Sequence, residues 1–525
     1  MPAGRPGVFG TGASGGEPAN QPGPTARWGL PLAVVVVGMF MSVLDTSIVN
    51  VAIPTMQKEF NATSDDIEWV STAYTLCLGV VVPTSAWLGE RLGLRRVYLI
   101  SLLSFSAFSA MCGMAGGLDT MIAYRILQAV PAGVIPVTCL TILYRMVPRE
   151  KLGAAMGLYG FGIVVAPGVG PAMGGYLVEY VNWRLIFYIN VPIGIIGAAA
   201  ALFVLPRFPS TPGRRFDVPG FVCVAAGLFA LLLAISEGQK WGWTGYRVLI
   251  LLAVSANLLA LFVGIELAVK QPLLNVRVFA SWPFVNSLIL ITINTMGMFA
   301  VLYYVPQFLQ NGQGITPMNT GLVVLPQAVV MAAIMPLAGR IYDRFGARWP
   351  AVTGLTLNSV GTYLMIGLTS EVTRPEIIAW TTLRAAGLAM SMMPIMTAGL
   401  SSLPSHLNNS GSAFNTLFQR VSSALGVGAM TALTTFQQSQ FMADRSSLLR
   451  SGGADADPRI LAMQQQGAGG LLGMWRQLQS EVLAQTYSNM FLVITILTTI
   501  GIPLAFLLQS GRPERGEGGE PAEAG

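Results

Sequence analysis

The sequence predicts an all-α polytopic membrane protein, and three observations favour that class. Of 525 residues, 53% are hydrophobic and 10% are charged, whereas an average soluble protein carries about 25% charged residues. The mean hydropathy is +0.61. Apolar stretches of roughly 20 residues recur along the chain, and each can cross about 30 Å of hydrocarbon as a helix. So few charges cannot solvate a 55.7 kDa chain in water, so a soluble globular fold is excluded.

The apolar stretches number fourteen and lie between two polar tails. The first tail, 1–29, is rich in Gly, Pro and Ala and reads as a flexible segment rather than a cleaved signal peptide. The second tail is 510–525. An even number of spans places both tails on one side of the membrane. The predicted spans are 30–56, 69–89, 97–116, 118–144, 153–177, 185–206, 218–237, 247–269, 283–308, 320–341, 350–369, 377–400, 411–436 and 487–509.

The distribution of basic residues predicts the orientation. Eighteen of the 30 Lys and Arg fall on the tails and on every second loop, against five in the short loops of the other side. Basic residues collect in cytoplasmic loops, so both termini are expected in the cytoplasm and the chain in the inner membrane. The net charge of +6 comes from scattered residues and not from a basic run, so we expect no nucleic-acid partner.

The polar residue types exclude several chemistries. All four cysteines lie within apolar stretches, which argues against a disulfide framework or a thiolate metal site. His406 is the single histidine and makes a poor metal site alone. No lysine is followed by Ser or Thr, so a Walker phosphate-binding loop is absent from the sequence. We therefore expect neither a metal, nor a cofactor, nor ATP hydrolysis.

A short segment occurs twice with the same spacing. Residues 86–95 read AWLGERLGLR at the end of the second span, and 339–348 read GRIYDRFGAR at the end of the tenth, 253 positions later. Both copies fall at the predicted cytoplasmic end of a helix, so the chain contains two parallel repeats. If each repeat has six helices, two more helices lie between them, which gives a 6 + 2 + 6 arrangement.

The repeated loop resembles that of the major facilitator superfamily, and the 6 + 2 + 6 arrangement resembles its fourteen-span drug:proton antiporters of the EmrB/QacA type. Residues 44–54 are similar to the span-1 motif of that group and 183–194 to the start of its span 6. The resemblance implies the major facilitator fold, with an N-terminal half at 30–206, two added helices and linkers at 207–282, and a C-terminal half at 283–509.

Asp45 is the only acidic residue well inside a span, while Glu266 lies nearer a span end. A charge within the bilayer is expensive and usually functional. Asp45 and Arg125 fall at matching depth, and the segment Arg125–Gln128 resembles the proton-coupling motif of the family. We hypothesise that Arg125 affects the proton affinity of Asp45 and that the pair couples protons to transport. The alternative is a fixed salt bridge that only orients helices.

The resemblance assigns two further sets of residues. The repeated loops are expected to latch a cytoplasmic gate, rather than serve only as basic residues that set topology. The glycine-rich fifth span is expected to form a tight, proton-impermeable hinge typical of antiporters; the alternative is generic close packing of small residues. The gating residues are Glu90, Arg91, Gly93, Arg95, Gly339, Asp343, Arg344, Gly346 and Arg348, and the antiporter motif residues are Pro167, Gly168, Gly170, Pro171, Gly174 and Gly175.

Polar, aromatic and thioether side chains of the central spans are candidates to line a substrate cavity. Flexible Met and aromatic faces suit a pocket that accepts many apolar shapes, although Met in an apolar helix is more often packing. Arg384 and Arg420 lie in spans that hold no acid, so each needs carbonyls, water, a polar neighbour or an anionic ligand group. The candidates are Asn50, Gln128, Asn294, Met298, Tyr303, Gln307, Arg384 and Arg420.

The predicted outer loop 437–486 is unusually long, and 471–483 has rough helical periodicity. It is a candidate to lie on the membrane, cover the outer vestibule or contact a periplasmic adaptor protein.

These features predict a proton-coupled exporter of amphipathic drugs that works by alternating access. The same machine could instead carry a lipid, a siderophore or a secreted metabolite. A membrane-embedded lipid-modifying enzyme is a remote alternative, because the sequence offers no cluster of nucleophile, base or metal ligands. A sensor without transport activity is a further alternative. It would usually carry an added soluble domain, and the two polar tails are too short to form one.

Overall fold

The structure, a computed structural model, describes residues 28–508 except 211–212, 214, 316, 369–371 and 451–466. Those residues form helices and connecting turns, with no β-strand among them. The two predicted tails lie almost entirely outside this part. The longer helices are α1 (Gly29–Glu59), α2 (Ser64–Val81), α3 (Thr84–Leu92), α4 (Leu94–Gly113), α5 (Leu118–Met146), α6 (Leu152–Tyr180), α8 (Asn190–Val204), α9 (Val218–Trp241), α10 (Tyr246–Ala268), α11 (Trp282–Gln307), α12 (Pro317–Phe345), α13 (Arg348–Leu364), α14 (Arg374–Ser401), α15 (Asn408–Arg450) and α17 (Gly467–Phe506).

Short turns complete the chain between these helices. Their bounds are η1 (Arg149–Lys151), α7 (Leu185–Tyr188), η2 (Val276–Ala280), η3 (Phe308–Gly312), η4 (Met365–Gly367) and η5 (Ser405–Leu407).

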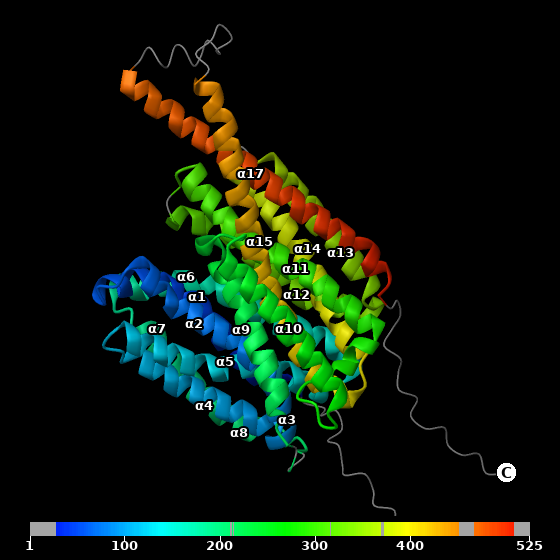
Figure 1. The fold of residues 1–525 in the computed structure, drawn as a ribbon. Coiled ribbons are helices and arrows are strands. Elements are labelled where there is room, and N and C mark those ends of the chain that lie inside the picture. The colour runs from blue at the N-terminus through cyan, green and yellow to red at the C-terminus, as the bar shows by residue number, and fades with distance from the viewer. Residues whose placement is uncertain are drawn as a thin grey trace, which may run out of the picture.

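The predicted all-α polytopic class is confirmed by the bundle that these helices form (Figure 1). Among the described residues, eleven helices are long and apolar enough to cross a membrane, and the bent pair α2 and α3 raises that number to twelve. Two helices are not among these: α13, which is short at 17 residues, and α15, which is more polar. Both lie where a span was predicted, and the total of fourteen stays a prediction.

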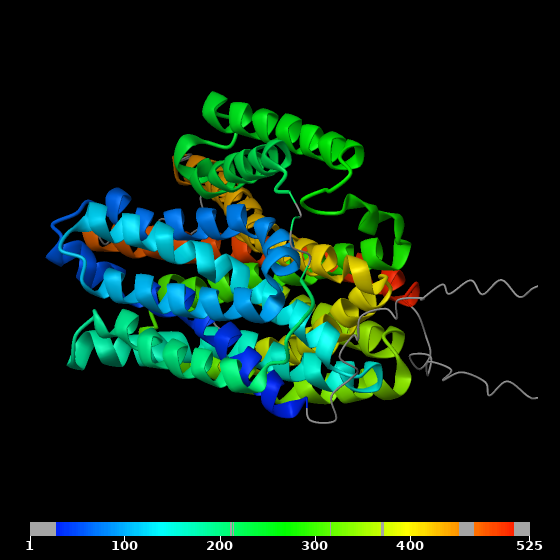
Figure 2. The same ribbon diagram turned by 90° about the horizontal axis from the view of Figure 1, so that it is seen from below.

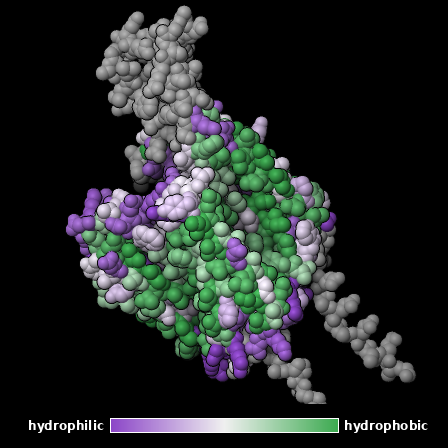
Figure 3. All heavy atoms as spheres, viewed as in Figure 1, coloured by the Kyte–Doolittle hydropathy of each residue, from purple (hydrophilic) through white to green (hydrophobic). Residues whose placement is uncertain are grey.

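The surface is that of a membrane protein. On the face seen in Figure 3, hydrophobic residues cover most of the bundle and hydrophilic ones gather toward its ends. Many large apolar side chains lie exposed along the helices, among them Phe203, which is 85% exposed, and Ile196, which is 69% exposed. Such exposure is costly in water and ordinary against lipid.

Local sequence explains where several helices begin. The Thr63 hydroxyl accepts the backbone N–H of Asp66 at the start of α2, and Asp217 accepts that of Gly220 at the start of α9. At α14, Thr373 and Glu376 form a capping box. In each case a short polar side chain satisfies a backbone donor that the first helical turn leaves without a partner.

The second predicted span is not one straight helix. It breaks after Val81, and α2 and α3 meet at a bend of 56°. Pro83 stands at the break, where it lacks the N–H that a continuous helix would need. The prediction of a single span at 69–89 missed this bend, although the proline was visible in the sequence.

The segment predicted as the long outer loop, 437–486, is helical on both of its flanks. The α15 helix continues to Arg450, and α17 begins at Gly467, well before the predicted fourteenth span. These extensions project beyond the rest of the bundle (Figure 1). The helical periodicity at 471–483 is confirmed, because this segment lies within α17.

The two helices between the halves have different surroundings. The α10 helix packs mainly on α9 and lies at the edge of the bundle (Figure 2), with only 17% of its apolar window buried. The α9 helix lies between α2 of the N-terminal half and α15 of the C-terminal half. A Cβ added at Gly79 of α2 would come within 2.4 Å of Leu232 of α9, and one at Gly428 of α15 within 2.6 Å of Ile235. Thus α9 contacts both halves through glycine positions.

Candidate functional site

The Asp45 carboxylate lies at the centre of a buried polar network in the N-terminal half. Its Oδ2 accepts a hydrogen bond from Nη1 of Arg125 at 2.7 Å. Its Oδ1 accepts bonds from the amide nitrogens of Gln128, at 3.1 Å, and Asn190, at 3.0 Å. All four residues are at most 1% exposed. Helices α1, α5 and α8 thus bring one acid, one base and two amides together away from solvent.

The Arg125 guanidinium has further partners that hold it in place. Its Nη1 also donates to Oε1 of Gln128 at 2.8 Å, and its Nε donates to the carbonyl of Val70 at 3.4 Å. The guanidinium carbon lies 3.7 Å from the centre of the Tyr74 ring, a distance at which a cation is attracted to the aromatic face. Both α2 contacts come from one face of that helix, so Arg125 links α1, α2 and α5.

The structure therefore brings Asp45 and Arg125 together, and it also shows that Gln128 belongs to this network. Sequence reasoning missed Asn190 and Tyr74 as members. Asn190 is fixed in turn by Ser109, whose hydroxyl accepts from the Asn190 amide at 3.1 Å and donates to the carbonyl of Phe187. The resemblance of 183–194 to a family motif was the available signal for Asn190. No sequence pattern pointed to Tyr74.

At the end of the bundle that carries Glu90 and Asp343, here called the motif end, the two halves are hydrogen-bonded to each other. The Asp343 carboxylate of α12 accepts the backbone N–H groups of Gly153, at 2.7 Å, and Ala154, at 3.0 Å. These donors lie in the first turn of α6. The N-terminus of a helix has free N–H groups and a positive dipole end, and both favour a carboxylate. Asp343 thus caps a helix of the opposite half.

The first copy of the motif makes an equivalent contact. The amide nitrogen of Asn409, in the first turn of α15, donates to Glu90 at 3.2 Å. The side-chain oxygen of Asn409 accepts from Arg145 at 3.4 Å. Near the same end, the Tyr144 hydroxyl donates to the carbonyl of Thr397. These hydrogen bonds join helices of the two halves at this end, which is therefore closed.

The basic residues of the two motif copies bind inside their own halves. Arg95 donates to the carbonyl of Leu202 near the end of α8, and Arg348 donates to that of Leu508 after α17, at 3.0 Å. A cation is favourable beside the last carbonyls of a helix. Arg91 lies over the Trp87 ring and Arg344 over the Phe345 ring.

The motif glycines supply backbone conformations. Gly93 and Gly346 both have left-handed backbones, with φ of 83° and 78°, which a residue with a Cβ adopts only at a cost. Gly339 lies at the crossing of α12 with α6, where a Cβ would come within 1.9 Å of the Gly153 carbonyl oxygen. The two copies share their turn geometry as well as their sequence.

The α6 helix presents glycines to two different neighbours. Toward α12 of the opposite half lie Gly153, Gly157 and Gly160, where an added Cβ would meet atoms of α12 or Met393 within 3.0 Å. Toward α1 of its own half lie Gly170 and Gly174, where a Cβ would meet Ser47 or Ile48 within 2.8 Å. The helix is therefore packed by small residues on two sides.

The remaining antiporter-motif residues differ in their surroundings. Gly168 would place a Cβ 3.3 Å from Ala328 of α12, and Gly175 has nothing within 4 Å. The helix runs without a break past Pro167 and Pro171, and the side chain of Pro171 lies outside the described atoms.

The substrate-cavity candidates do not form one cluster. Asn50 accepts a hydrogen bond from Ser71 at the exposed outer part of α1 and α2. Asn294 is buried between Ser391 and Asn358. Tyr303 is 44% exposed, Gln307 is partly exposed near the end of α11, and Met298 packs beside α12 and α14.

The two arginines of the C-terminal half also differ. Arg384 is buried and 3% exposed, whereas Arg420 is partly exposed on α15.

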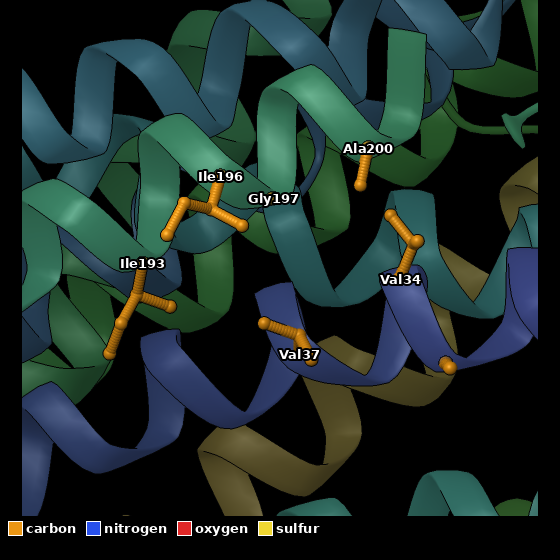
Figure 4. A pocket seen from close by; sticks show the side chains of 7 residues that line it. Val34, Val37, Ile193, Ile196, Gly197 and Ala200 are labelled. Atoms are coloured by element: carbon orange, nitrogen blue, oxygen red, sulfur yellow. The ribbon is translucent and has the colours of Figure 1, made fainter. Parts of the chain in front are cut away.

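A surface groove lies elsewhere. It has a volume of about 290 Å³ and is formed by α1 and α8, where Val34, Val37, Ile193, Ile196, Gly197 and Ala200 line it (Figure 4). No charged or hydrogen-bonding side chain lines it, so it offers none of the polar contacts that fix a ligand's orientation. None of the predicted site residues lies there.

Comparison with known proteins identifies the family to which the chain is similar. Residues 35–427 match the family model of the Major Facilitator Superfamily. An uncharacterised MFS-type transporter, YhcA of Bacillus subtilis, is 33% identical over 84% of this chain and 82% of its own length. The tetracenomycin C resistance and export protein of Streptomyces glaucescens is 28% identical over 90% of both chains.

Solved structures agree on the fold. The proton:xylose symporter XylE, an MFS protein, superposes with a TM-score of 0.57 at 14% identity, over 90% of this chain and 95% of that one. At this identity the likeness concerns the fold alone. The repeated motif, the helical bundle and the family match agree, and the chain belongs to the major facilitator superfamily as a multi-pass membrane transporter and not an enzyme.

Proposed function

We propose that this transporter is a proton-coupled antiporter that exports amphipathic compounds across the inner membrane by alternating access. The observation that carries the proposal is the Asp45 carboxylate, which is fully buried and held by Arg125, Gln128 and Asn190. A titratable group in such a position can exchange a proton only when its surroundings change. A change of conformation can therefore be coupled to uptake or release of a proton.

The two halves supply the change of conformation. At the motif end, the Asp343 and Glu90 carboxylates accept hydrogen bonds from a helix N-terminus and from the Asn409 amide. Neither carboxylate is fully buried, so these bonds can break without leaving a buried charge alone. The glycines of α6 and α12 meet closely through backbone atoms. We propose that these contacts form when the motif end, which we place in the cytoplasm, is closed, and that they separate when it opens.

Export of drugs is proposed from the relatives. The Streptomyces protein is named for tetracenomycin C resistance and export, and a Mycobacterium tuberculosis relative, 30% identical over 76% of this chain, is named multidrug resistance protein Stp. A lipid, siderophore or secreted metabolite is the alternative cargo for the same mechanism.

We propose that the helical extensions of α15 and α17 are the surface that contacts a periplasmic adaptor protein.

The test is dye uptake into inverted membrane vesicles from cells that express the wild type, Asp45→Asn or Asp119→Asn. Asp119 is an exposed acid in the first turn of α5, so its substitution is a matched control. Uptake that requires a proton gradient in the wild type and the control, and is lost in Asp45→Asn, is the expected result. Gradient-driven uptake in Asp45→Asn would refute the coupling role. If the wild type accumulates no dye under a gradient, the multidrug proposal fails and the metabolite alternative is next.

A further inference from the structure

Arg384 is a buried cation without a counterion. Its side chain is 3% exposed and its Nε has no hydrogen-bond partner. Among the described residues, no hydrogen bond or ion pair to its terminal nitrogens is formed either. It lies ten residues from the start of α14 at Arg374, or about 15 Å along the helix axis. A lone charge at this depth is costly unless something pairs with it.

Among the side chains of the C-terminal half that the structure describes, two are carboxylates, and neither pairs with Arg384. They are Asp343, at the motif end, and Glu376, at the other end of α14. Asp343 is bound to the first turn of α6, and Glu376 accepts the N–H and hydroxyl of Thr373. Glu376 precedes Arg384 by eight residues, about 12 Å of helix. Neither of these two carboxylates is therefore the partner of Arg384.

The internal repeat shows where a partner would stand. In the N-terminal half, Ser42 of α1 donates to the carbonyl of Ala132, which follows Arg125 by seven residues on α5. In the C-terminal half, Asn294 of α11 donates to Ser391, which follows Arg384 by seven residues on α14. The two contacts fix the same register between corresponding helix pairs.

Ser42 and Asn294 are thus corresponding residues, and the position of the counterion lies three residues after each of them. Three residues after Ser42 stands Asp45, the partner of Arg125. Three residues after Asn294 stands Gly297. A second contact agrees with the alignment, because Asn190 of α8 touches Asp45 and Ile494 of α17 lies nearest to Gly297. The C-terminal half therefore has an arginine, Arg384, at the position of Arg125, but it has Gly297 at the position of Asp45.

We propose that Arg384 is the cationic centre of an anion site, in which a carboxylate group of a ligand takes the place that the Asp45 side chain fills in the N-terminal half. A carboxylate matches the planar guanidinium with two oxygens. A Cβ at Gly297 would have one neighbour within 4 Å, the Ile494 side chain at 3.2 Å, so a ligand group here requires that side chain to shift slightly. The carboxylate comes either from a small free acid or from an amphipathic cargo, and the second source rests on the proposed function.

The first experiment measures the thermal midpoint of the full chain, purified in detergent, against sodium benzoate at constant ionic strength. Benzoate is expected to raise the midpoint of the wild type in a saturable way, with chloride giving no such shift, and Arg384→Gln is expected to abolish the benzoate effect. No saturable shift in the wild type, an equal shift with chloride, or an undiminished shift in Arg384→Gln would each overturn the site.

Substitution at Gly297 tests the register. Gly297→Asp restores a built-in carboxylate, and Gly297→Asn adds nearly the same volume without charge. Without ligand, the Asp variant is expected to unfold at a higher temperature than the Asn variant. This difference is expected to vanish when Arg384→Gln is present in both. Equal midpoints for the two single variants would contradict the placement of the carboxylate at Gly297.

A dye pair separates the two sources of the carboxylate. A rhodamine with a free carboxyl group is expected to compete with benzoate, whereas its methyl ester is not. If neither competes, the site belongs to small free acids. These measurements use no proton gradient, and Asp45→Asn is expected to keep the benzoate shift. A wild type that binds benzoate but shows no gradient-driven export therefore refutes the proposed function alone, and a wild type that exports but shows no saturable benzoate shift refutes the anion site alone.

Discussion

Gly153 of α6 and Gly339 of α12 cross with their backbones in contact. A Cβ on Gly153 would lie 2.2 Å from the Gly339 carbonyl oxygen, and a Cβ on Gly339 would lie 1.9 Å from that of Gly153. Both obstacles are backbone atoms, which cannot rotate out of the way. The closed motif end thus depends on two positions that have no side chain, one in each half.

Gly153→Ala or Gly339→Ala is expected to open the motif end. Overpacking of a tight contact costs about 1–3 kcal/mol, which corresponds to about a 5- to 150-fold shift in population. Spin labels at the exposed loop residues Glu150 and Ser405 are expected to move apart in an electron-spin distance measurement. Gly175→Ala is the control, because nothing lies within 4 Å of its added Cβ. An unchanged distance distribution in both crossing variants would contradict the gate.

Asp343→Asn is expected to loosen the same closed end without adding volume. The substitution removes the charge from a carboxylate that accepts two N–H groups at the start of α6, and charged acceptors at such a position contribute about 0.3–2 kcal/mol. The same spin-label pair measures the effect. Glu376→Gln, which alters a carboxylate bound within its own half, should leave the distance alone. A response to both substitutions would mean that the shift is not specific to the inter-half contact.

Substitution of one member of the Asp45 and Arg125 pair is expected to destabilise the protein strongly. A buried ion that loses its partner costs about 3–5 kcal/mol. Arg125→Gln and Asp45→Asn should each lower the thermal midpoint, and the double variant should recover part of that loss because neither charge is left alone. Gradient-driven transport should stay absent in the double variant. Additive losses of stability in the double variant would show that the two side chains do not interact.

Lys240→Gln is expected to have little effect. Lys240 of α9 binds Asp65 and Glu68 of α2 at 2.9 and 2.6 Å, but Asp65 is 83% exposed and Glu68 is 55% exposed. Exposed ion pairs contribute at most about 1 kcal/mol and are screened by salt. The thermal midpoint at low and high salt checks this. A large loss of stability or of transport would indicate that α9 must be fastened to α2 for the halves to work.

Much of the architecture followed from the sequence because hydropathy acts over each span separately. Lipid requires an uninterrupted apolar helix wherever the chain crosses, so composition alone predicted the bundle and most of the helices in it. The spacing of the repeated motif predicted two related halves, and Gly93 and Gly346 proved to share their left-handed turn. Asp45 and Arg125 were singled out because charges within spans are rare.

Boundaries and partners needed the tertiary structure. The break at Pro83 and the helices that replace the loop at 437–486 depend on local backbone bonding that hydropathy does not encode. The roles of Asn190 and Tyr74 depend on which faces α2, α5 and α8 turn toward α1, and that is decided by packing between helices distant in the sequence. The cavity candidates were dispersed for the same reason: residue type alone cannot give the direction in which a side chain points.

The sequence by itself therefore determined the class, the repeat and the charged residues of the spans, because each follows from local composition and spacing. Only the tertiary structure decided that Asp343 caps a helix of the opposite half, that Gly153 meets Gly339, and that Arg384 is buried with its Nε unpaired. These relationships arise when helices far apart in the chain come within hydrogen-bonding distance, and no local pattern of residues records that distance.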